Sequence, residues 1–422
     1  MHSVLKNIPV FFRIPLTRNK RGIFVLYNSL FSLKTVCMNE IQDAAYWMAL
    51  AHLPNWRIGR INTLIADILH SRGLALSDFF QCNEQEWQQE FQLSPKETDD
   101  ISAAKSKLSQ LASLTEELFK KEFELIPINS RNYSKILKNN LKLKYAPPLL
   151  YVKGDARLLQ ESSAAIVGSR NASDISLQFT GNIAQKCVAN YQVVVNGFAK
   201  GVDKTALEST LKYNGKSIIV LPQGILKFAG GFKRYAEQIL AGDVLVLSTF
   251  PPKAPWAVKF AMTRNRYIYG LAEEIYVAES DSSGGTWSGA IDGLKKGRTV
   301  YVRKPGEQEK NANALLIQKG AIPVDFEGNP LSSISVQTPD IAEPLTDDKM
   351  PEEIETKMKE LLANAGKPLS AKQIKKKLEL DVDTRKFSRQ VKNIDWIAVV
   401  RQKNSLRFRL KTGTGCQEDL FG

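Results

Sequence analysis

The chain has 422 residues and a formal charge of +14, and 43% of its residues are hydrophobic. This length and composition predict a globular protein of several domains. No apolar run reaches the roughly 18 residues that span a membrane, so we expect no membrane segment. The four cysteines form no CxxC pair, so we expect neither a metal site nor a disulfide framework. We also expect no cofactor, and a cytoplasmic location.

The excess of basic over acidic residues lies mainly at the two ends of the chain. Residues 1–37 contain six Lys or Arg and no acid, and residues 351–412 contain 16 basic residues against eight acids. A clean amphipathic segment begins at Met38, so we expect residues 1–37 to be a basic extension and favour Met38 over Met1 as the translation start. The excess of eight charges at 351–412 predicts a surface that attracts a polyanion, although a solvated lysine-rich helix face would look similar.

Residues 38–125 are predicted to form a small helical domain. Amphipathic segments are separated there by turn residues such as Pro54 and Pro95. The pattern predicts helices at 40–52, 57–70, 75–82, 84–91 and 95–122, the last with a possible break.

Residues 126–332 follow a different pattern, in which short β-rich runs alternate with segments of helical length. Near-continuous apolar strands that alternate with helices are typical of a parallel sheet covered on both faces. We therefore predict a doubly wound, mostly parallel α/β domain. Its strands are expected at 149–152, 164–168, 193–196, 217–221, 244–248, 274–278, 299–302 and 321–324.

The C-terminal part is expected to begin with a polar, Pro-containing linker at 333–350. Residues 351–412 then predict three helices followed by a basic β-hairpin, which is the arrangement of a winged-helix module. The third helix, Thr384–Ile394, is the one that such modules place in a DNA groove, but many of them contact proteins instead. Residues 413–422 are expected to form a flexible tail.

Three loops that follow predicted strands contain glycine and basic or polar residues. At the carboxyl edge of a parallel sheet such loops line the ligand crevice, glycine allows close backbone approach, and helix N-termini offer free N–H groups to phosphate. Together with two arginines farther along the chain, the pattern predicts a site for a phosphate or phosphodiester. The candidate residues are Gly168, Ser169, Arg170, Asn196, Gly197, Lys200, Gly201, Arg264, Asn265, Arg266, Ser283 and Gly284.

Residues for nucleotide chemistry are missing from the sequence. It has no GxxxxGK[ST] loop and no GxGxxG fingerprint, and its three histidines all lie within the first 70 residues. The acids nearest the glycine loops, Asp203 and Glu279, have no evident catalytic partner, and Asp203 is expected to cap a helix. We expect no catalytic residue.

The glycine and arginine motifs resemble those of the DprA/Smf DNA-processing family. The likeness rests on YAPPLLYVKGD at 145–155, AIVGSRNAS at 165–173, GFAKGVD at 197–203, TRNRYIYGL at 263–271 and the pair Ser283-Gly284, in the order and spacing of that family. The resemblance implies a Rossmann-like core and a non-enzymatic, homodimeric protein that binds single-stranded DNA and helps to load RecA recombinase in recombination or natural transformation.

The sequence also departs from the family pattern. Asn196 replaces a usual Ser, Leu207 replaces a usual His, and Phe260 lies four residues before Arg264 where the family has an aromatic three before. Phe260 or Phe198 is expected to stack a base.

Two other functions stay open. A related Rossmann-like pocket would suit a nucleotide sensor or a nucleoside-monophosphate hydrolase, but no acid follows the loop at 283 until Asp292. A winged-helix DNA-binding regulator would follow from the basic C-terminal unit. Separately, Gln417, Leu420 and Phe421 resemble the Gln-x-x-Leu-Phe peptide that docks on the replication sliding clamp.

Overall fold

The computed structural model describes residues 38–331, 352–380, 387–388, 391, 394, 397–402 and 405–410. The chain divides into two compact units, before and after Ser333, and each is described by itself. The basic extension, the linker at 333–350 and the tail at 413–422 lie outside the described residues. Within the described residues, no helix is long and apolar enough to cross a membrane.

The first unit begins with the short helices that the sequence predicts. Ser94 starts one of them with a capping box, in which its hydroxyl accepts from the Glu97 N–H and the Glu97 carboxylate accepts from the Ser94 N–H. The predicted break in the last segment is present between residues 105 and 108. The helices are a first one at 38–51, α2 (Ile58–Ala66) with a π-helical turn at Asp67–Ser71, α3 (Leu76–Gln81), α4 (Glu84–Gln89), α5 (Pro95–Lys105) and α6 (Leu108–Lys120).

A nine-stranded sheet follows, in the order β1-β2-β6-β5-β4-β3-β7-β8-β9. Strands β3 to β9 pair in parallel, whereas β1 and β2 are antiparallel to their neighbours, so the predicted mostly parallel α/β architecture is confirmed. The bounds are β1 (Glu124–Pro127), β2 (Leu149–Lys153), β3 (Ser163–Val167), β4 (Val193–Asn196), β5 (Ser217–Val220), β6 (Val244–Ser248), β7 (Glu274–Val277), β8 (Thr299–Arg303) and β9 (Ile322–Val324). Strand β1 was not among the expected strands, and the predicted domain boundary after residue 125 falls inside it.

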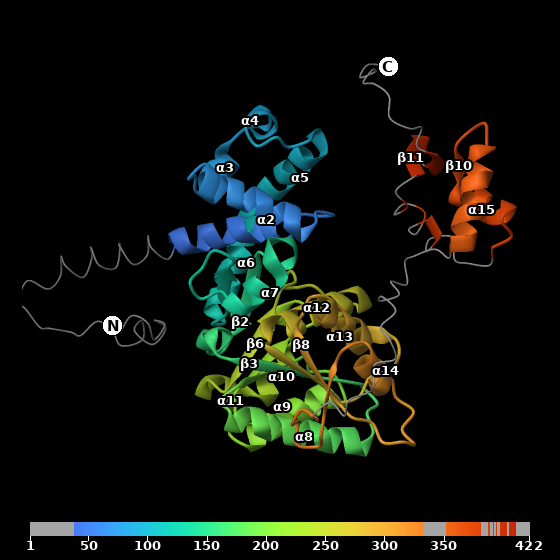
Figure 1. The fold of residues 1–422 in the computed structure, drawn as a ribbon. Helices are drawn as coiled ribbons and strands as arrows, with labels where there is room; N and C mark the ends of the chain where they lie inside the picture. Colours follow the sequence, from blue (N-terminus) through green and yellow to red (C-terminus); the bar gives the residue numbers. More distant parts are fainter. Residues whose placement is uncertain are drawn as a thin grey trace, which may run out of the picture. The chain divides into compact units, whose positions relative to one another are not determined.

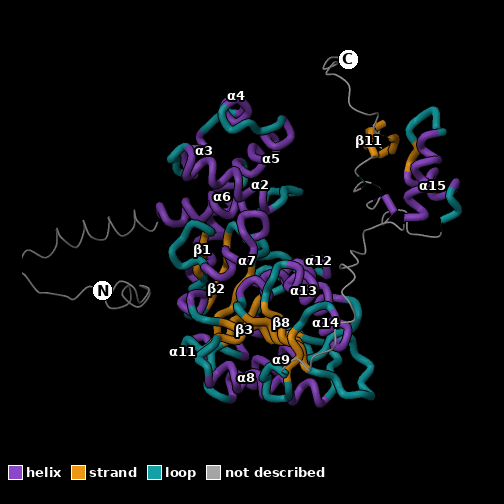
Figure 2. The backbone as a smooth tube through the Cα atoms, viewed as in Figure 1, coloured by secondary structure: helices purple, strands orange, loops and turns teal. Residues whose placement is uncertain are grey.

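Helices cover both faces of the sheet (Figures 1 and 2). Alternate residues of β3 enter different cores: Ala164 and Ile166 pack with α8 and α9, whereas Ala165 and Val167 share a core with α12. The helices of this α/β domain are α7 (Lys135–Tyr145), α8 (Asp174–Ala189), α9 (Val202–Lys212), α10 (Ala229–Arg234), α11 (Ala236–Ala241), α12 (Val258–Leu271), α13 (Gly284–Lys295) and α14 (Asn313–Gln318).

The N-terminal helices share a continuous apolar core with the sheet, from Trp47 to Ala321. Two polar contacts fix this junction. The buried Asn62 side chain donates to the Leu143 carbonyl at 2.7 Å and the Ala146 carbonyl at 2.8 Å, at the end of α7. His52 Nε2 is hydrogen-bonded to the Tyr151 hydroxyl of β2 at 2.8 Å, and burial lowers the pKa of His52 to about 4.

The second unit contains α15 (Glu352–Ala363), β10 (Leu369–Ser370), α16 (Ala371–Lys377), β11 (Ile397–Gln402) and β12 (Ser405–Leu410). The strands form a small antiparallel sheet in the order β10-β12-β11 around a core that includes Met358, Ile374 and Phe408. Most of the expected third helix, Thr384–Ile394, lies outside the described residues, so the winged-helix assignment stays a prediction.

Candidate nucleic-acid interface

The loops after β3 and β4 touch each other at the carboxyl edge of the sheet. Gly201 has a φ of +80°, and a Cβ there would lie 2.5 Å from the Ser169 carbonyl oxygen and 2.6 Å from that of Arg170. The Ser169 N–H in turn donates to the Glu279 carbonyl after β7, at 2.9 Å. Only glycine therefore fits at position 201, and three predicted site loops meet at one edge.

The outer rim of this edge is basic. Arg170 and Lys200 are both exposed, and no carboxylate of the described residues forms an ion pair with either. They border a hollow of about 440 Å³ that is also lined by Gly201 and Lys204. The acid in its wall, Glu208, is already paired with Arg234 at 2.9 Å. The rim therefore carries uncompensated positive charge.

Arg264 lies beneath this rim with only 3% of its surface exposed. The nearest acid is Asp203, whose Oδ2 is 3.8 Å from Arg264 Nη1, too far for a hydrogen bond. Arg264 Nε and Nη1 have no hydrogen-bond partner among the described residues. The guanidinium occupies the space where a Cβ of Gly197 would stand, which explains the glycine at that position.

This arrangement perturbs both charged groups. Burial lowers the pKa of Arg264 and raises the pKa of Asp203, although the two opposite charges partly offset these shifts. A buried guanidinium with unused donors is costly unless a ligand satisfies it. An anionic oxygen is the complementary ligand, because it supplies the missing acceptor and a second negative charge close to the guanidinium.

Asn196 is fully buried at the end of β4. Its amide nitrogen donates to the Ser217 hydroxyl at 2.9 Å, and its oxygen accepts from the Phe198 N–H at 3.0 Å. The side chain thus shapes the loop that carries Gly197 and does not reach the rim.

The start of α13 forms the third part of the edge. Ser283 and Gly284 are exposed there, and Gly284 has a φ of +88°. The Asn265 amide lies against Gly285, where a Cβ would collide with it, and the Tyr269 hydroxyl donates to the Thr286 carbonyl at 3.0 Å. α12 therefore holds the α13 N-terminus at this edge of the sheet. We call the edge formed by these three loops, together with the hollow at Arg170 and Lys200, the pocket.

Arg266 is separated from Arg264. Its guanidinium lies 4.4 Å from the ring centroid of Tyr145, at the end of α7. Two residues on a helix are turned by about 200° from each other, so the two arginines of the motif leave α12 on opposite sides. The structure brings the glycine loops, Arg170, Lys200 and Arg264 together, and it places Arg266 elsewhere.

The two candidate stacking residues are both partly packed. Phe198 meets Phe228 edge to face at a centroid distance of 5.0 Å, and Phe260 lies against Phe250 at 4.5 Å. By contrast, half of the surface of Trp256, just before α12, is exposed. Trp256 was not among the residues predicted from the sequence; an aromatic residue four positions before Phe260 was the signal that could have indicated it.

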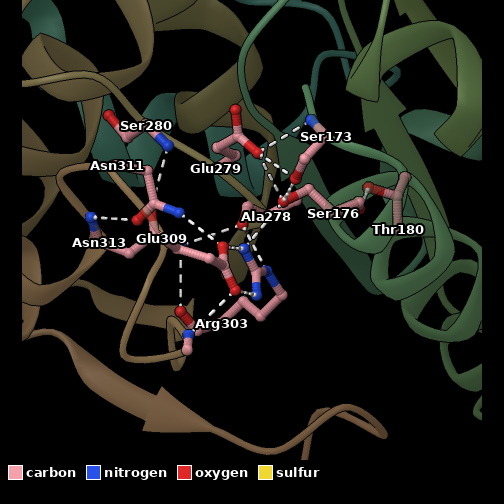
Figure 3. Close-up of polar contacts among 11 residues, drawn as sticks. Ser173, Ser176, Thr180, Ala278, Glu279, Ser280, Arg303, Glu309, Asn311 and Asn313 are labelled. Atoms are coloured by element: carbon pink, nitrogen blue, oxygen red, sulfur yellow. Dashed lines mark hydrogen bonds and ion pairs between the residues drawn. The ribbon is translucent and has the colours of Figure 1, made fainter. Parts of the chain in front are cut away.

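A polar network joins the end of β8, the segment after β7 and the start of α8 (Figure 3). Arg303, at the end of β8, donates to the Ala278 carbonyl at 3.1 Å, to the Ser176 hydroxyl at 2.9 Å and to both oxygens of Glu309. The Glu279 carboxylate accepts from the Ser173 N–H at 3.0 Å and from both the Ser173 and Ser176 hydroxyls. Glu279 therefore fixes Ser173, the N-cap residue of α8, and this structural role accounts for it.

Comparison with known proteins identifies relatives of this architecture. The family model described as "DNA recombination-mediator protein A" matches residues 124–332. The DNA processing protein DprA of Streptococcus pneumoniae is 33% identical over 157 residues, which cover 37% of this chain and 55% of that protein. The chain spans between about half and two thirds of the length of the curated relatives it matches.

Two solved structures are similar to the described fold. DNA processing protein A from S. pneumoniae has a TM-score of 0.49 and 25% identity, over 67% of this chain and 94% of that one. DNA processing protein A from Helicobacter pylori, solved to describe its binding of single-stranded DNA, has a TM-score of 0.41 and 25% identity, over 48% of this chain and 90% of that one.

Proposed function

Because this chain is a divergent member of the DprA/Smf family, we propose that it is a DNA-processing protein that binds single-stranded DNA at the carboxyl edge of its sheet. The observation that carries the proposal is the buried Arg264, whose guanidinium has unused donors and no hydrogen-bonded acid. A phosphodiester oxygen supplies what this side chain lacks.

The surrounding residues suit a nucleic-acid backbone. Arg170 and Lys200 offer charges at the rim, and the free N–H groups at the start of α13 offer donors. The proposed contact set is Gly168, Ser169, Arg170, Gly197, Lys200, Gly201, Arg264, Asn265, Ser283 and Gly284, with Asn196 acting through the loop that it shapes.

Base contacts would come from aromatic residues near the start of α12 and in the loop after β4. Phe260 and Phe198 are half-buried, and Trp256 presents the larger exposed ring. A base stacked on such a ring contributes on the order of 1–3 kcal/mol without regard to sequence. We therefore propose binding with little sequence preference.

The wider role follows from the family. We propose that the protein is a cytoplasmic homodimer that helps to load RecA on single-stranded DNA and performs no catalytic step of its own. The C-terminal unit would add a further DNA or protein contact, and the tail residues Gln417, Leu420 and Phe421 would dock on the sliding clamp. A pull-down with purified clamp, comparing wild type with Leu420→Ala plus Phe421→Ala, tests the last point; equal recovery would contradict it.

A fluorescence anisotropy titration with a labelled oligonucleotide tests the main proposal. Wild type should bind at low salt, and its affinity should fall steeply as salt rises because phosphate contacts release counterions. Arg170→Ala plus Lys200→Ala should weaken binding at least tenfold, whereas Lys96→Ala plus Lys107→Ala, two exposed lysines of the N-terminal helices, should not. Absence of binding at low salt, or equal affinities of all three proteins, would contradict it.

A further inference from the structure

The second arginine of the α12 motif belongs to a separate basic cluster. Three cations surround the ring of Tyr145: Arg266 Cζ lies 4.4 Å from its centroid, Lys144 Nζ 5.2 Å and Lys296 Nζ 5.3 Å. These distances are within the range of cation–π contacts. We call this group the Tyr145 cluster.

The charges of this cluster are poorly compensated. Because all three lie close to one ring, each pair is separated by no more than about 10 Å, which is the Debye length at 0.1 M salt. Lys296 is paired with Asp292 at 2.6 Å. In the part of the chain that the structure describes, no carboxylate forms an ion pair with Arg266 or Lys144.

The cluster has a rigid base. Asn62 donates to the carbonyls on either side of Lys144 and Tyr145, namely those of Leu143 and Ala146. The backbone of this short segment is therefore clamped to α2, and Gly59 approaches Lys144 so closely that a Cβ there would lie 3.3 Å from its Cα. Arg266 and Lys144, which have no carboxylate partner among the described residues, repel each other, and a bound polyanion would relieve that repulsion.

The position of the cluster relative to the pocket indicates which polyanion fits. Helix α13 begins at the pocket with Gly284 and ends beside the cluster, because Lys296 is its C-cap residue. Its 12 residues correspond to about 18 Å. A nucleic-acid strand that leaves the pocket along α13 would thus reach the Tyr145 cluster after several nucleotides.

We infer that the Tyr145 cluster is a second contact surface for the DNA backbone, which binds the phosphates of the strand outside the pocket. This inference rests on the proposed function and adds to it a site size larger than the pocket. Arg266 and the two lysines supply the charge, and Tyr145 holds them in place.

The inference predicts a dependence on oligonucleotide length. Lys144 and Lys296 are exposed, so Lys144→Ala plus Lys296→Ala should leave the fold intact. A dT oligonucleotide of about 6 residues fills only a short site, whereas one of about 30 residues covers both surfaces. For the long oligonucleotide, the double variant should make the slope of log affinity against log salt shallower by about 1.4, since each lost single-strand phosphate contact contributes about 0.7. For the short one, the slope and the affinity should stay as in wild type.

Each outcome of this experiment decides one point. Equal binding of the long oligonucleotide by wild type and the double variant would overturn the cluster while leaving the pocket proposal intact. An equal loss for both oligonucleotides would also overturn it, because the lysines would then act at the pocket. If wild type binds neither, the proposed function itself fails, and the inference fails with it. Lys96→Ala plus Lys107→Ala, with the same change of charge, is the control and should match wild type for both lengths.

Discussion

The carboxyl edge of the sheet contains two arginines that are equally buried and differently bonded. Arg303 and Arg264 each expose 3% of their surface. Arg303 donates to a carboxylate, a hydroxyl and a carbonyl, whereas Arg264 stands 3.8 Å from its nearest acid with two nitrogens unused. A satisfied buried arginine supports structure, and an unsatisfied one indicates a missing ligand.

The acids beside the two arginines show the same difference. Hydrogen bonds from Arg303 lower the pKa of Glu309 to about 2. Asp203 lacks such a bond from Arg264, and burial raises its pKa instead. Hydrogen bonds thus favour the charged form of Glu309, whereas burial disfavours the charged form of Asp203.

The largest expected effect is a loss of stability when the hydrogen-bonded arginine, Arg303, is replaced. Arg303→Met would remove the ion-pair partner of the Glu309 carboxylate and one hydrogen bond of the Ser176 hydroxyl, so the free energy of unfolding should fall by about 3–5 kcal/mol. Urea denaturation followed by circular dichroism measures this. A loss below about 1 kcal/mol would show that the network is not structural.

The next largest effect is a loss of DNA binding when Arg264, the arginine with unused donors, is replaced. Arg264→Met should lower the affinity for single-stranded DNA at least tenfold, because a charged hydrogen bond to phosphate contributes about 1.5–3 kcal/mol. It should destabilise the fold less than Arg303→Met does, since Arg264 makes no hydrogen bond through Nε or Nη1. Arg157→Met, at an exposed arginine paired with Asp155, removes the same charge and is the control for anisotropy; it should bind as wild type does. Unchanged affinity of Arg264→Met would remove this arginine from the site.

A smaller effect is expected from low pH, which should weaken the ion pair between Arg303 and Glu309. The pKa of Glu309 is about 2 in the folded protein and near the ordinary 4.5 when unfolded, so its stabilising contribution is present above pH 4.5 and is lost as the pH falls toward 2. Lowering the pH to 3 should therefore remove about 2 kcal/mol that Glu309→Gln does not lose. Parallel pH profiles of wild type and Glu309→Gln would contradict this assignment.

The smallest effect has the opposite sign. The pKa of Asp203 is higher in the folded protein than in the unfolded chain. At a pH above the folded pKa the charged carboxylate therefore lowers the free energy of unfolding, and this cost disappears as the pH falls through the folded pKa. Asp203→Asn should raise the free energy of unfolding at neutral pH by about 1 kcal/mol or less, because the amide oxygen still accepts from the Ala199 N–H. A clear loss of stability would mean that the Arg264–Asp203 pair behaves like the Arg303–Glu309 pair.

Much of the fold was predictable from the sequence, because strand-length apolar runs and glycine turns are local signals. Strand β1 was missed because its four residues, ELIP, are short and end in proline. The predicted glycine loops do meet at one edge, as the carboxyl ends of parallel strands must.

The side-chain arrangement was harder to predict. Arg264 and Arg266 were predicted to act as one motif, but residues two apart on a helix point to opposite sides, so only Arg264 reaches the loops. Asn196 ends a strand buried on both faces, so its polar side chain points inward despite its place beside a glycine loop. The Arg303 network joins residues up to 127 positions apart, a distance that no local pattern reports.

The junction at Asn62 and His52 bears on how this protein can be divided. The segment that the family model recognises starts at Glu124, yet Tyr151 of β2 and the end of α7 are held by side chains from α2 and the helix before it. A fragment cut at that boundary would expose a core that runs from Trp47 onward and would leave the Leu143 and Ala146 carbonyls without their donor. The segment that the family model matches is thus shorter than the segment that shares one core. Replacing the N-terminal helices would require compensating changes in β2 and at the end of α7.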